Sequence, residues 1–329
     1  MKILVTGSSG HLGEAIIRKL NQNNIDSIGI DINPSEFTSH VGSISDKSEV
    51  NELMKKVDYV IHAATLHKPH VATHSHQEFV DTNISGTLNL LEAASCNKVK
   101  GFVFTSSTST FGYAMNPKAN EPAVWVSEEL RPIPKNIYGV TKIAAEDLCQ
   151  LFYQDKKLPC LILKTARFFP EEDDKKQIRA QYDQDNIKVL EYLNRRVDIE
   201  DVVSAHLLAV EKSQHIGFSK YIISATSPFQ TKDLAALNAD AKPVVRRLFP
   251  EMEQLFSEKG WKMLPKIDRV YDNSKARNEL GWKPKYDFEY ILNRLKEKKD
   301  FRSELAINIG KKGYHSEKFE CGPYPTTDE

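Results

Sequence analysis

The chain has 329 residues, which at about 150 residues per domain corresponds to two domains, or to one large domain carrying a smaller one. Its 45 Lys and Arg residues equal its 45 Asp and Glu residues, which argues against a nucleic-acid-binding protein and a polybasic membrane-surface protein. No apolar run reaches the roughly 18 residues of a membrane helix. Met1 leads directly into a strand-like segment, and the four cysteines form no CxxC pair. We therefore expect a cytoplasmic protein with reduced cysteines.

Short apolar runs rich in β-branched residues alternate with amphipathic helical patterns along the first 165 residues. The apolar runs predict buried strands at Ile3–Val5, Ser27–Ile30, Tyr59–Ala63, Phe102–Phe104 and Leu161–Leu163. The helical patterns cover Leu12–Leu20, Ser48–Lys55, Phe79–Ala94 and Tyr138–Tyr153. This alternation predicts an α/β fold with a doubly wound parallel sheet and helices on both of its faces.

The predicted domain boundaries follow the points where this alternation changes. Residues 1–165 are expected to form the sheet domain, completed by 195–225, where Asp198–Val210 is predicted to be helical and Tyr221–Ile223 to add a strand. Residues 166–194 and 226–300 are less regular and predict a small α+β cap interleaved with the sheet domain. Residues 301–329 are polar and weakly patterned, so we expect a C-terminal tail that is at best partly ordered.

A glycine-rich turn, Thr6-Gly7-Ser8-Ser9-Gly10-His11-Leu12-Gly13, lies between the first predicted strand and helix. Glycine lets the chain turn tightly and lets a pyrophosphate approach the backbone, and the N–H groups of the new helix attract phosphates. Asp31 ends the second predicted strand, where a carboxylate accepts hydrogen bonds from a ribose diol and repels a 2′-phosphate. Since no Arg or Lys lies between Asp31 and His40, the sequence favours NAD over NADP. The alternative is a purely structural turn with a surface Asp.

Tyr138 and Lys142 are four residues apart in a predicted helix, so both lie on one helix face. A nearby ammonium lowers the phenol pKa from about 10, and the tyrosine can then exchange a proton with a substrate hydroxyl while a hydride moves to or from nicotinamide. The same spacing occurs at Tyr153/Lys157, Tyr271/Lys275 and Tyr314/Lys318. Tyr138 differs because it opens a helix and follows Thr105-Ser106-Ser107, which ends a predicted strand on the side of the ligand crevice. A Ser107 hydroxyl there can bind the substrate oxygen.

The TGxxGxxG loop, the YxxxK pair and the segment Ser274-Lys275-Ala276-Arg277-Asn278-Glu279-Leu280-Gly281-Trp282-Lys283-Pro284 together resemble extended short-chain dehydrogenase/reductases of the NAD-dependent epimerase/dehydratase family. The similarity covers residues 1–165 and resumes at 197–207 and 272–284. It implies a Rossmann-type domain with NAD as cofactor, and a small-molecule substrate that is a sugar or sugar nucleotide. It also implies a homodimer through the helices around Asn83 and Tyr138.

The resemblance further implies which residues act. The catalytic triad is Ser107, Tyr138 and Lys142. The cofactor contacts are Gly7, Ser9, Gly10, His11, Leu12, Gly13, Asp31, Ser43, Ile44, His62, Ala63, Ala64, Asn83, Tyr138 and Lys142. Within this set, His62-Ala63-Ala64 matches the segment that lines the nicotinamide side. Ser43 stands where family members usually carry an acid near the adenine.

The residues after Ser107 separate reactions within the family. Sugar-nucleotide 4,6-dehydratases resemble STDEVYG, with an acid pair after the catalytic hydroxyl, and UDP-glucuronate decarboxylases carry a glutamate where this chain has Ser109. Thr108 and Ser109 cannot serve as that acid. The remaining activities are an epimerase similar to UDP-galactose 4-epimerase, or a net dehydrogenase or reductase of a smaller anionic sugar-like substrate. A non-catalytic NAD-sensing protein is an alternative from another class.

The predicted substrate region departs from the pattern of UDP-galactose 4-epimerase-like proteins. Arg167 takes the place of an asparagine, and Asn194 takes the place of an arginine, with Arg195 and Arg196 next to it. The expected substrate contacts are Ser107, Thr108, Arg167 and Arg196. Arg167 is either a clamp for a carboxylate or phosphate, or an ion-pair partner of Glu171 or Glu172. The pair Arg246-Arg247 is either a second clamp or solvated.

Four histidines fall within ten residues, at His67, His70, His74 and His76. Such a cluster can ligate zinc, but neither a cysteine nor an HExxH spacing accompanies it. In the resembled family the same segment enters the nucleotide crevice. We therefore expect no metal, and a polar loop that partly faces the substrate.

Overall fold

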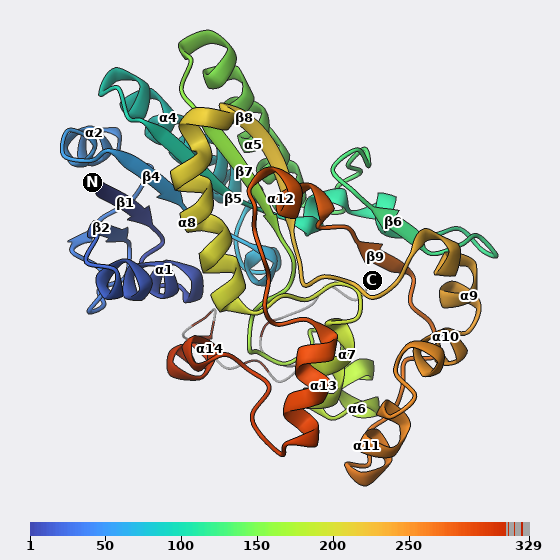
Figure 1. The fold of residues 1–329 in the computed structure, drawn as a ribbon. Helices are drawn as coiled ribbons and strands as arrows, with labels where there is room; N and C mark the ends of the chain where they lie inside the picture. Colours follow the sequence, from blue (N-terminus) through green and yellow to red (C-terminus); the bar gives the residue numbers. More distant parts are fainter. Residues whose placement is uncertain (314, 316–318, 320–323, 325–329) are drawn as a thin grey trace.

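A seven-stranded sheet with all neighbours parallel forms the centre of the protein (Figure 1). The computed structural model describes residues 1–313, 315, 319 and 324. The strands of the sheet, in chain order, are β1 (Lys2–Thr6), β2 (Asp26–Asp31), β3 (His40–Val41), β4 (Tyr59–His62), β5 (Gly101–Ser107), β7 (Cys160–Thr165) and β8 (Phe218–Ile223). Their spatial order, β3-β2-β1-β4-β5-β7-β8, extends outward from β1 in both directions. The predicted doubly wound α/β fold is confirmed, and the short strand β3 is an addition to the predicted set.

Helices cover both faces of the sheet because successive strand side chains point to opposite faces. In β1, Ile3 and Val5 join one core while Leu4 joins the other, and all three are fully buried. The first core contains α1 (His11–Gln22) and α8 (Ile199–Ile216). The second contains α2 (Lys47–Met54), α4 (Gly86–Cys96) and α5 (Ile137–Lys156).

The helix predicted at Phe79–Ala94 begins earlier and changes its winding. Ser75 and Glu78 form a capping box, with Ser75 N donating to Glu78 Oε2 at 2.7 Å and Glu78 N donating to Ser75 Oγ at 3.2 Å. Helix α3 (His76–Phe79) therefore starts at His76. It continues through a π-helical stretch, Val80–Ser85, into α4.

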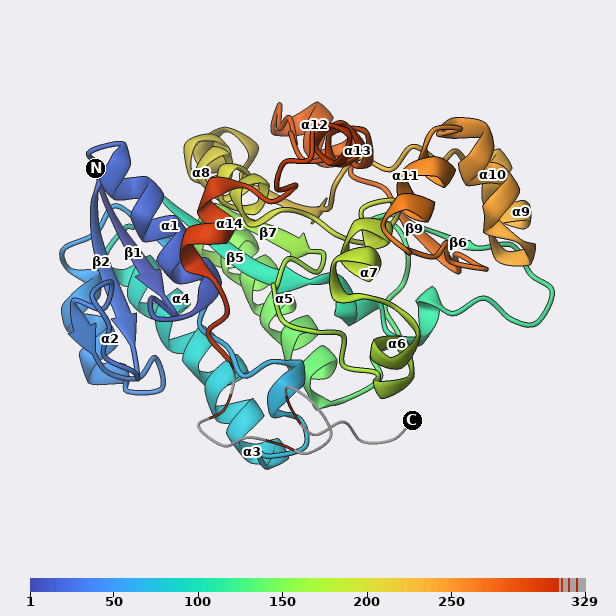
Figure 2. The same cartoon turned by 90° about the horizontal axis from the view of Figure 1, so that it is seen from below.

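The segments expected to form the cap enclose a third core beside the sheet domain (Figure 2). Their helices are α6 (Lys176–Gln181), α7 (Gln184–Glu191), α9 (Leu234–Ala239), α10 (Ala241–Leu248), α11 (Met252–Glu258) and α13 (Phe288–Lys296). Helix α12 (Ser274–Glu279) lies within the expected cap segment but contacts β8 and packs into the first core of the sheet domain. A two-stranded parallel sheet joins β6 (Val124–Val126) to β9 (Arg269–Tyr271). Strand β6 comes from the segment 1–165, so the sheet domain contributes a strand to this smaller layer.

Part of the segment expected to be a tail is folded. Helix α14 (Glu304–Ile309) contacts α1 and α8, and Ser303 caps it by accepting a hydrogen bond from Ala306 N at 3.0 Å. Within the expected tail, residues 301–313, 315, 319 and 324 are described, and the others lie outside the described residues. No helix among the described residues is long and apolar enough to cross a membrane.

Candidate active site

A cavity of about 1370 Å³ lies at the carboxyl ends of β1, β4, β5 and β7. Doubly wound sheets bind ligands at this edge, where the strand order reverses. The glycine loop forms one end of the cavity, the end of β5 and the start of α5 form its middle, and cap residues 194–195 and 264–271 line the far end. The predicted cofactor and substrate sites therefore share one continuous space.

Most predicted site residues line this cavity. Those that do are Gly7, Ser9, Gly10, His11, Leu12, Gly13, Asp31, Ser43, Ile44, Ala63, Ala64, Ser107, Thr108, Tyr138 and Arg167. Four do not: His62, Asn83, Lys142 and Arg196.

The glycine loop fits a dinucleotide because its backbone is packed too tightly for side chains. Gly7 has a φ of +74°, and a Cβ there would lie 2.8 Å from Ala64 N. A Cβ at Gly13 would lie 2.0 Å from Gly7 O. Gly10 precedes α1, and no side chain caps this helix, so its first N–H groups are available to a diphosphate.

Asp31 stands at the end of β2 and lines the cavity. Its Oδ2 accepts a hydrogen bond from Ser9 N at 3.1 Å, and its Oδ1 accepts one from Asn33 N at 2.9 Å. These bonds hold the carboxylate next to the glycine loop. The arrangement fits NAD, with bare backbone for the diphosphate and a carboxylate for the ribose diol.

His62 is buried behind the cavity wall. Its Nδ1 lies 2.7 Å from Thr6 Oγ1 and its Nε2 lies 2.9 Å from Thr87 Oγ1. Burial holds the pKa of this imidazole well below its ordinary value, so it is neutral. Thr6 Oγ1 also accepts hydrogen bonds from the backbone N–H groups of Ala63 and Ala64, at 3.1 and 3.0 Å. His62 and Thr6 thus position the backbone that lines the cavity after β4.

Asn83 is also buried and positions the wall. Its Oδ1 accepts hydrogen bonds from Thr65 Oγ1 and Leu66 N, both at 2.9 Å. Its Nδ2 donates to Leu66 O at 2.9 Å and to Thr141 Oγ1 at 3.0 Å. Asn83 therefore joins the loop after β4 to α5, and its amide is occupied by protein groups.

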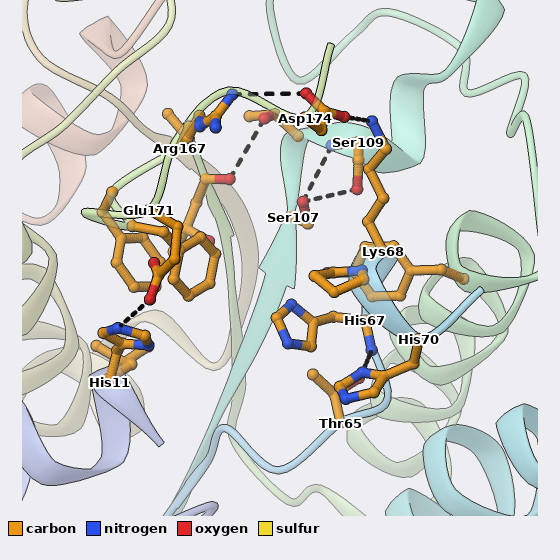
Figure 3. Close-up of a pocket in the computed structure, with 18 of the residues that line it drawn as sticks. His11, Thr65, His67, Lys68, His70, Ser107, Ser109, Arg167, Glu171 and Asp174 are labelled. Carbon is orange, nitrogen blue, oxygen red and sulfur yellow. Dashed lines mark hydrogen bonds and ion pairs between the residues drawn. The ribbon is translucent and has the colours of Figure 1, made fainter. Parts of the chain in front are cut away.

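Tyr138 lies in the first turn of α5, which begins where Asn136 Oδ1 accepts a hydrogen bond from Gly139 N at 3.1 Å. Tyr138, Ser107 and Ser109 line the same part of the cavity, and the two serine hydroxyls lie close enough to the Tyr138 phenol to influence its pKa. The two serine Oγ atoms are 2.8 Å apart (Figure 3). Burial raises the pKa of Tyr138 above its ordinary value, and the two hydroxyls partly oppose that rise. The structure thus brings together a phenol and two hydroxyls on one cavity wall.

Lys142 lies one turn further along α5 and is 2% exposed. Its Nζ donates to Thr105 O at 2.6 Å and lies 4.0 Å from the centre of the Phe104 ring. Burial lowers the pKa of Lys142 to about 7, and Glu146 opposes this decrease. The expected lowering of the Tyr138 pKa by Lys142 is not found, because burial raises the pKa of the phenol and only the two serine hydroxyls oppose that rise.

Behind Lys142 lies a buried charge network that no motif indicated. Glu146 Oε1 accepts hydrogen bonds from Lys164 Nζ at 2.6 Å and from Ser106 Oγ at 2.5 Å, and its Oε2 accepts one from Lys220 Nζ at 3.1 Å. Glu146 and Lys164 are 1% and 2% exposed. One sequence signal was available, since a lysine within the apolar strand Cys160–Thr165 requires a buried partner.

Arg167 lines the cavity, but carboxylates already balance its charge. Its Nη1 lies 3.0 Å from Asp173 Oδ2, 3.9 Å from Asp174 Oδ1 and 3.7 Å from Glu191 Oε1. Its Nη2 donates to Glu172 O at 2.9 Å. Burial lowers the pKa of Arg167, but the three carboxylates raise it more strongly. The ion-pair alternative therefore describes this residue, with partners other than the predicted side chains of Glu171 or Glu172.

Arg196 lies outside the cavity, contrary to expectation. Its Nη1 donates to Glu191 Oε2 at 2.7 Å and its Nη2 donates to Phe169 O at 2.5 Å. Arg195 lines the cavity instead, with its Nη2 2.9 Å from Glu191 Oε1. The reason is register, because residue 196 forms a β-bridge with Arg167 and adjacent side chains of extended backbone point in opposite directions.

Arg246 and Arg247 lie on α10, away from the cavity. Arg246 Nη2 is 2.6 Å from Glu253 Oε1, and Arg247 Nη2 is 2.7 Å from Asp233 Oδ1. Both arginine side chains are 53% exposed. The pair is therefore solvated, which is the second of the two predicted readings.

The predicted histidine loop contributes His67 and His70 to the cavity wall. His67 N donates to His70 Nδ1 at 3.1 Å, and the two rings are 4.8 Å apart. Burial, assisted by His70, holds the pKa of His67 well below its ordinary value. Among the described residues, no group of three or more His, Cys, Asp or Glu side chains is arranged to hold a metal ion.

Two ion pairs connect the sheet domain to the segment after β7 (Figure 3). His11 Nε2, at the start of α1, lies 3.0 Å from Glu171 Oε1. Lys68, in the loop after β4, pairs with Asp174. No local pattern indicates either pair, because the partners are more than 100 residues apart in the chain.

A family model described as the NAD dependent epimerase/dehydratase family matches residues 3–223. The chain belongs to this family. The protein is therefore an enzyme that uses NAD, and the predicted resemblance is confirmed. The matched region includes the glycine loop, Tyr138 and Lys142.

The chain and two curated relatives are identical at 26% to 30% of their aligned residues. The chain is 30% identical over 190 residues to the uncharacterized UDP-glucose epimerase YtcB of Bacillus subtilis, a match that covers 51% of this chain and 56% of that protein. It is 26% identical over 342 residues to UDP-glucose 4-epimerase of Lactobacillus helveticus, covering 87% and 93%. The first match thus spans about half the length of the relative.

Two solved structures show that the fold is shared. One is a short-chain dehydrogenase/reductase superfamily protein from Agrobacterium tumefaciens with bound NAD, with a TM-score of 0.64, 23% identity, and coverage of 91% of this chain and 95% of that chain. The other is UDP-glucuronic acid 4-epimerase from Bacillus cereus in complex with UDP-glucuronic acid and NAD, with a TM-score of 0.61, 23% identity, and coverage of 90% and 99%.

Proposed function

We propose that the protein is an NAD-dependent epimerase that acts on a secondary alcohol of a nucleotide sugar. The observation that carries this proposal is that Tyr138, Ser107 and Ser109 line the same cavity as the glycine loop. NAD, held by residues 7–13 and Asp31, supplies a hydride acceptor that can return the hydride.

In this mechanism Ser107 binds the substrate hydroxyl and Tyr138 removes its proton as the carbon loses a hydride, which leaves a ketone. For inversion, the ketone would have to turn over in the cavity between the two transfers, so that the returning hydride reaches the opposite face of the carbon while Tyr138 returns the proton to the oxygen. Lys142 is proposed to anchor the cofactor ribose and to stabilise the tyrosinate once ligands have displaced its bond to Thr105 O. Tyr138 would serve no purpose in a protein that only senses NAD.

Inversion is favoured over elimination by the residues that follow Ser107. Thr108 Oγ1 donates to Thr165 O at 3.3 Å, and Ser109 Oγ lies beside Ser107 Oγ. Neither residue can supply the carboxyl group that removes water from a sugar. Arg167 is held by ion pairs with Asp173, Asp174 and Glu191, so it is less available to clamp a small anionic substrate.

Unpaired polar groups at the far end of the cavity support a substrate with a polar nucleotide portion. Asn194 is 5% exposed, and its Oδ1 has no hydrogen-bond partner among the described residues. Arg269 Nε is likewise buried and unpartnered within that part of the chain. Both residues line the cavity. Buried polar atoms of this kind are stabilised when a ligand supplies the missing bonds.

The test is incubation of the protein with NAD and a panel of nucleotide sugars, with product stereochemistry followed by NMR and NADH by its absorbance. An epimer formed without NADH accumulation supports the proposal. Stoichiometric NADH would show the alternative net dehydrogenase, and conversion that persists in Y138F would refute the assigned chemistry. N194A should raise KM for the nucleotide sugar by about tenfold with a smaller effect on kcat.

We also propose that the protein forms a homodimer through α4 and α5. Val140 and Leu151 lie on α5 and are 48% and 46% exposed, although both are large and apolar. Burying such side chains against a second copy removes apolar surface from water. Light scattering should give twice the 37.4 kDa chain mass for the wild type, and substitution of both residues by Asp should shift it toward the monomer. A monomeric wild type would contradict this proposal.

A further inference from the structure

Residues 310–313, which directly follow α14, reach the cofactor end of the cavity. Figure 2 shows the chain leaving α14 beside α1. Lys312 and Gly313 line the cavity together with the glycine loop. Lys312 Nζ donates to Ser9 O at 2.8 Å, and Lys312 N donates to Glu171 Oε1 at 3.3 Å. A residue about 300 positions away in the chain thus contacts the loop that receives the cofactor diphosphate.

Lys311 and His315, on either side of Lys312, contact two further parts of the cavity wall. His315 Nε2 lies 2.9 Å from Pro69 O, and its ring is 5.2 Å from that of His70. Lys311 Nζ lies 3.9 Å from Glu172 Oε1. Lys311, Lys312 and His315 thus contact the segment after β7, the glycine loop and the loop after β4, respectively.

The Glu14 carboxylate lies beside Lys312, and a cation at this place neutralises it. Glu14 lies in the first turn of α1, the helix whose N-terminus faces the diphosphate, and it is 5% exposed. A buried carboxylate at this place repels a diphosphate unless its charge is neutralised. Arg18 Nε lies 2.7 Å from Glu14 Oε1, and Lys312 pairs with Glu14 Oε2. The Lys312 side chain is 23% exposed, so its charge is partly shielded from water.

We propose that Lys312 is a cofactor-binding residue, which neutralises the NAD diphosphate at the glycine loop and holds residues 310–313 beside the bound dinucleotide. The ammonium lies at Ser9 O, next to the backbone N–H groups on which a diphosphate would rest. Its flexible stem can turn toward the phosphates without movement of the backbone, while Arg18 continues to neutralise Glu14. The inference rests on NAD binding by the glycine loop, and it extends the site to a segment outside the matched family region.

The test is calorimetric titration of full-length protein with NAD, which does not depend on turnover. K312M should raise the Kd for NAD about 5- to 20-fold at low ionic strength, and the difference should shrink as salt is added. The matched control is K311M, which removes the adjacent lysine, 54% exposed and 3.9 Å from its carboxylate, and should stay within about twofold of wild type. An unchanged Kd in K312M overturns the proposal, whereas a wild type that binds no NAD would overturn the cofactor assignment instead.

A second variant separates direct contact from neutralisation of Glu14. In an E14Q background, K312M should still weaken NAD binding by at least about threefold, because the diphosphate remains a partner for the ammonium. If the effect of K312M vanishes there, Lys312 acts only on Glu14 and the proposal fails. Saturating NAD should also slow tryptic cleavage after Lys311 and Lys312. An unchanged cleavage rate would contradict the proposal that bound NAD holds residues 310–313 in place.

Discussion

Replacing Gly13 with alanine is expected to destabilise the protein by about 3 kcal/mol, the upper end of the usual cost of overpacking. A Cβ at this position would lie 2.0 Å from Gly7 O and 2.6 Å from Gly7 C, whereas ordinary contact begins at 3.4 Å. The loop and α1 would have to separate by 3.4 − 2.0 = 1.4 Å. Both clashing atoms belong to backbone, so no side-chain rotation can relieve the overlap.

Gly10→Ala is the matched control within the same loop. A Cβ at Gly10 would lie 3.3 Å from Gly7 O, and the φ of −74° suits any residue. We expect a stability change below about 1 kcal/mol. The added methyl group would nevertheless occupy the cavity where the diphosphate approaches the backbone, so NAD affinity should fall about tenfold or more.

Urea denaturation followed by tryptophan fluorescence measures the two stabilities, and calorimetric titration measures NAD affinity. G13A should lose both stability and affinity, while G10A should lose mainly affinity. The reasoning would be refuted if G13A unfolded within about 0.5 kcal/mol of wild type, or if G10A were the less stable of the two.

Three further predictions concern the catalytic helix and the cap. Y138F should lower kcat by about 10²- to 10⁴-fold, while the Kd for NAD stays within a few-fold of wild type. Steady-state kinetics and calorimetric titration measure the two quantities. A collapse of NAD affinity would instead assign Tyr138 to cofactor binding. Because the pKa of Lys142 is about 7, its charge is lost as the pH rises through that value, and NAD affinity should weaken there. K142R keeps its charge and should show a flat profile; a wild-type profile that is equally flat would contradict the lowered pKa. Burial would raise the pKa of Glu191, but the surrounding arginines lower it from 4.5 to about 2, so its stabilising contribution is full above pH 4.5 and is lost as the pH falls toward 2. E191Q should therefore be less stable by about 3 kcal/mol at neutral pH and should show a smaller acid loss in urea titrations; equal acid sensitivity would argue against the ion-pair cluster.

Local patterns were sufficient for the sheet and for the glycine loop. Ile3, Leu4 and Val5 are all buried and alternate between two cores, which is a period-two property of one short segment, and the requirement for glycine at Gly13 arises within a single turn. The helix limits were less predictable, since the capping box of Ser75 moved one start and a π-helical stretch interrupts the pattern. These features depend on side-chain hydrogen bonds that periodicity does not report.

The sequence by itself determined the fold, the NAD loop and the family, because these follow from contacts between near neighbours and from motifs of fixed spacing. Only the tertiary structure decided which charged groups reach the cavity. Arg195 faces it and Arg196 does not, Arg167 is balanced by carboxylates, and Lys312 arrives from the C-terminal segment. The pKa of Lys142 likewise follows from burial within the assembled core. All of these findings have the same physical reason. The free energy of a charge depends on its distances from other charges and on its exposure to water. Folding determines both, because it brings together residues that are far apart in the chain.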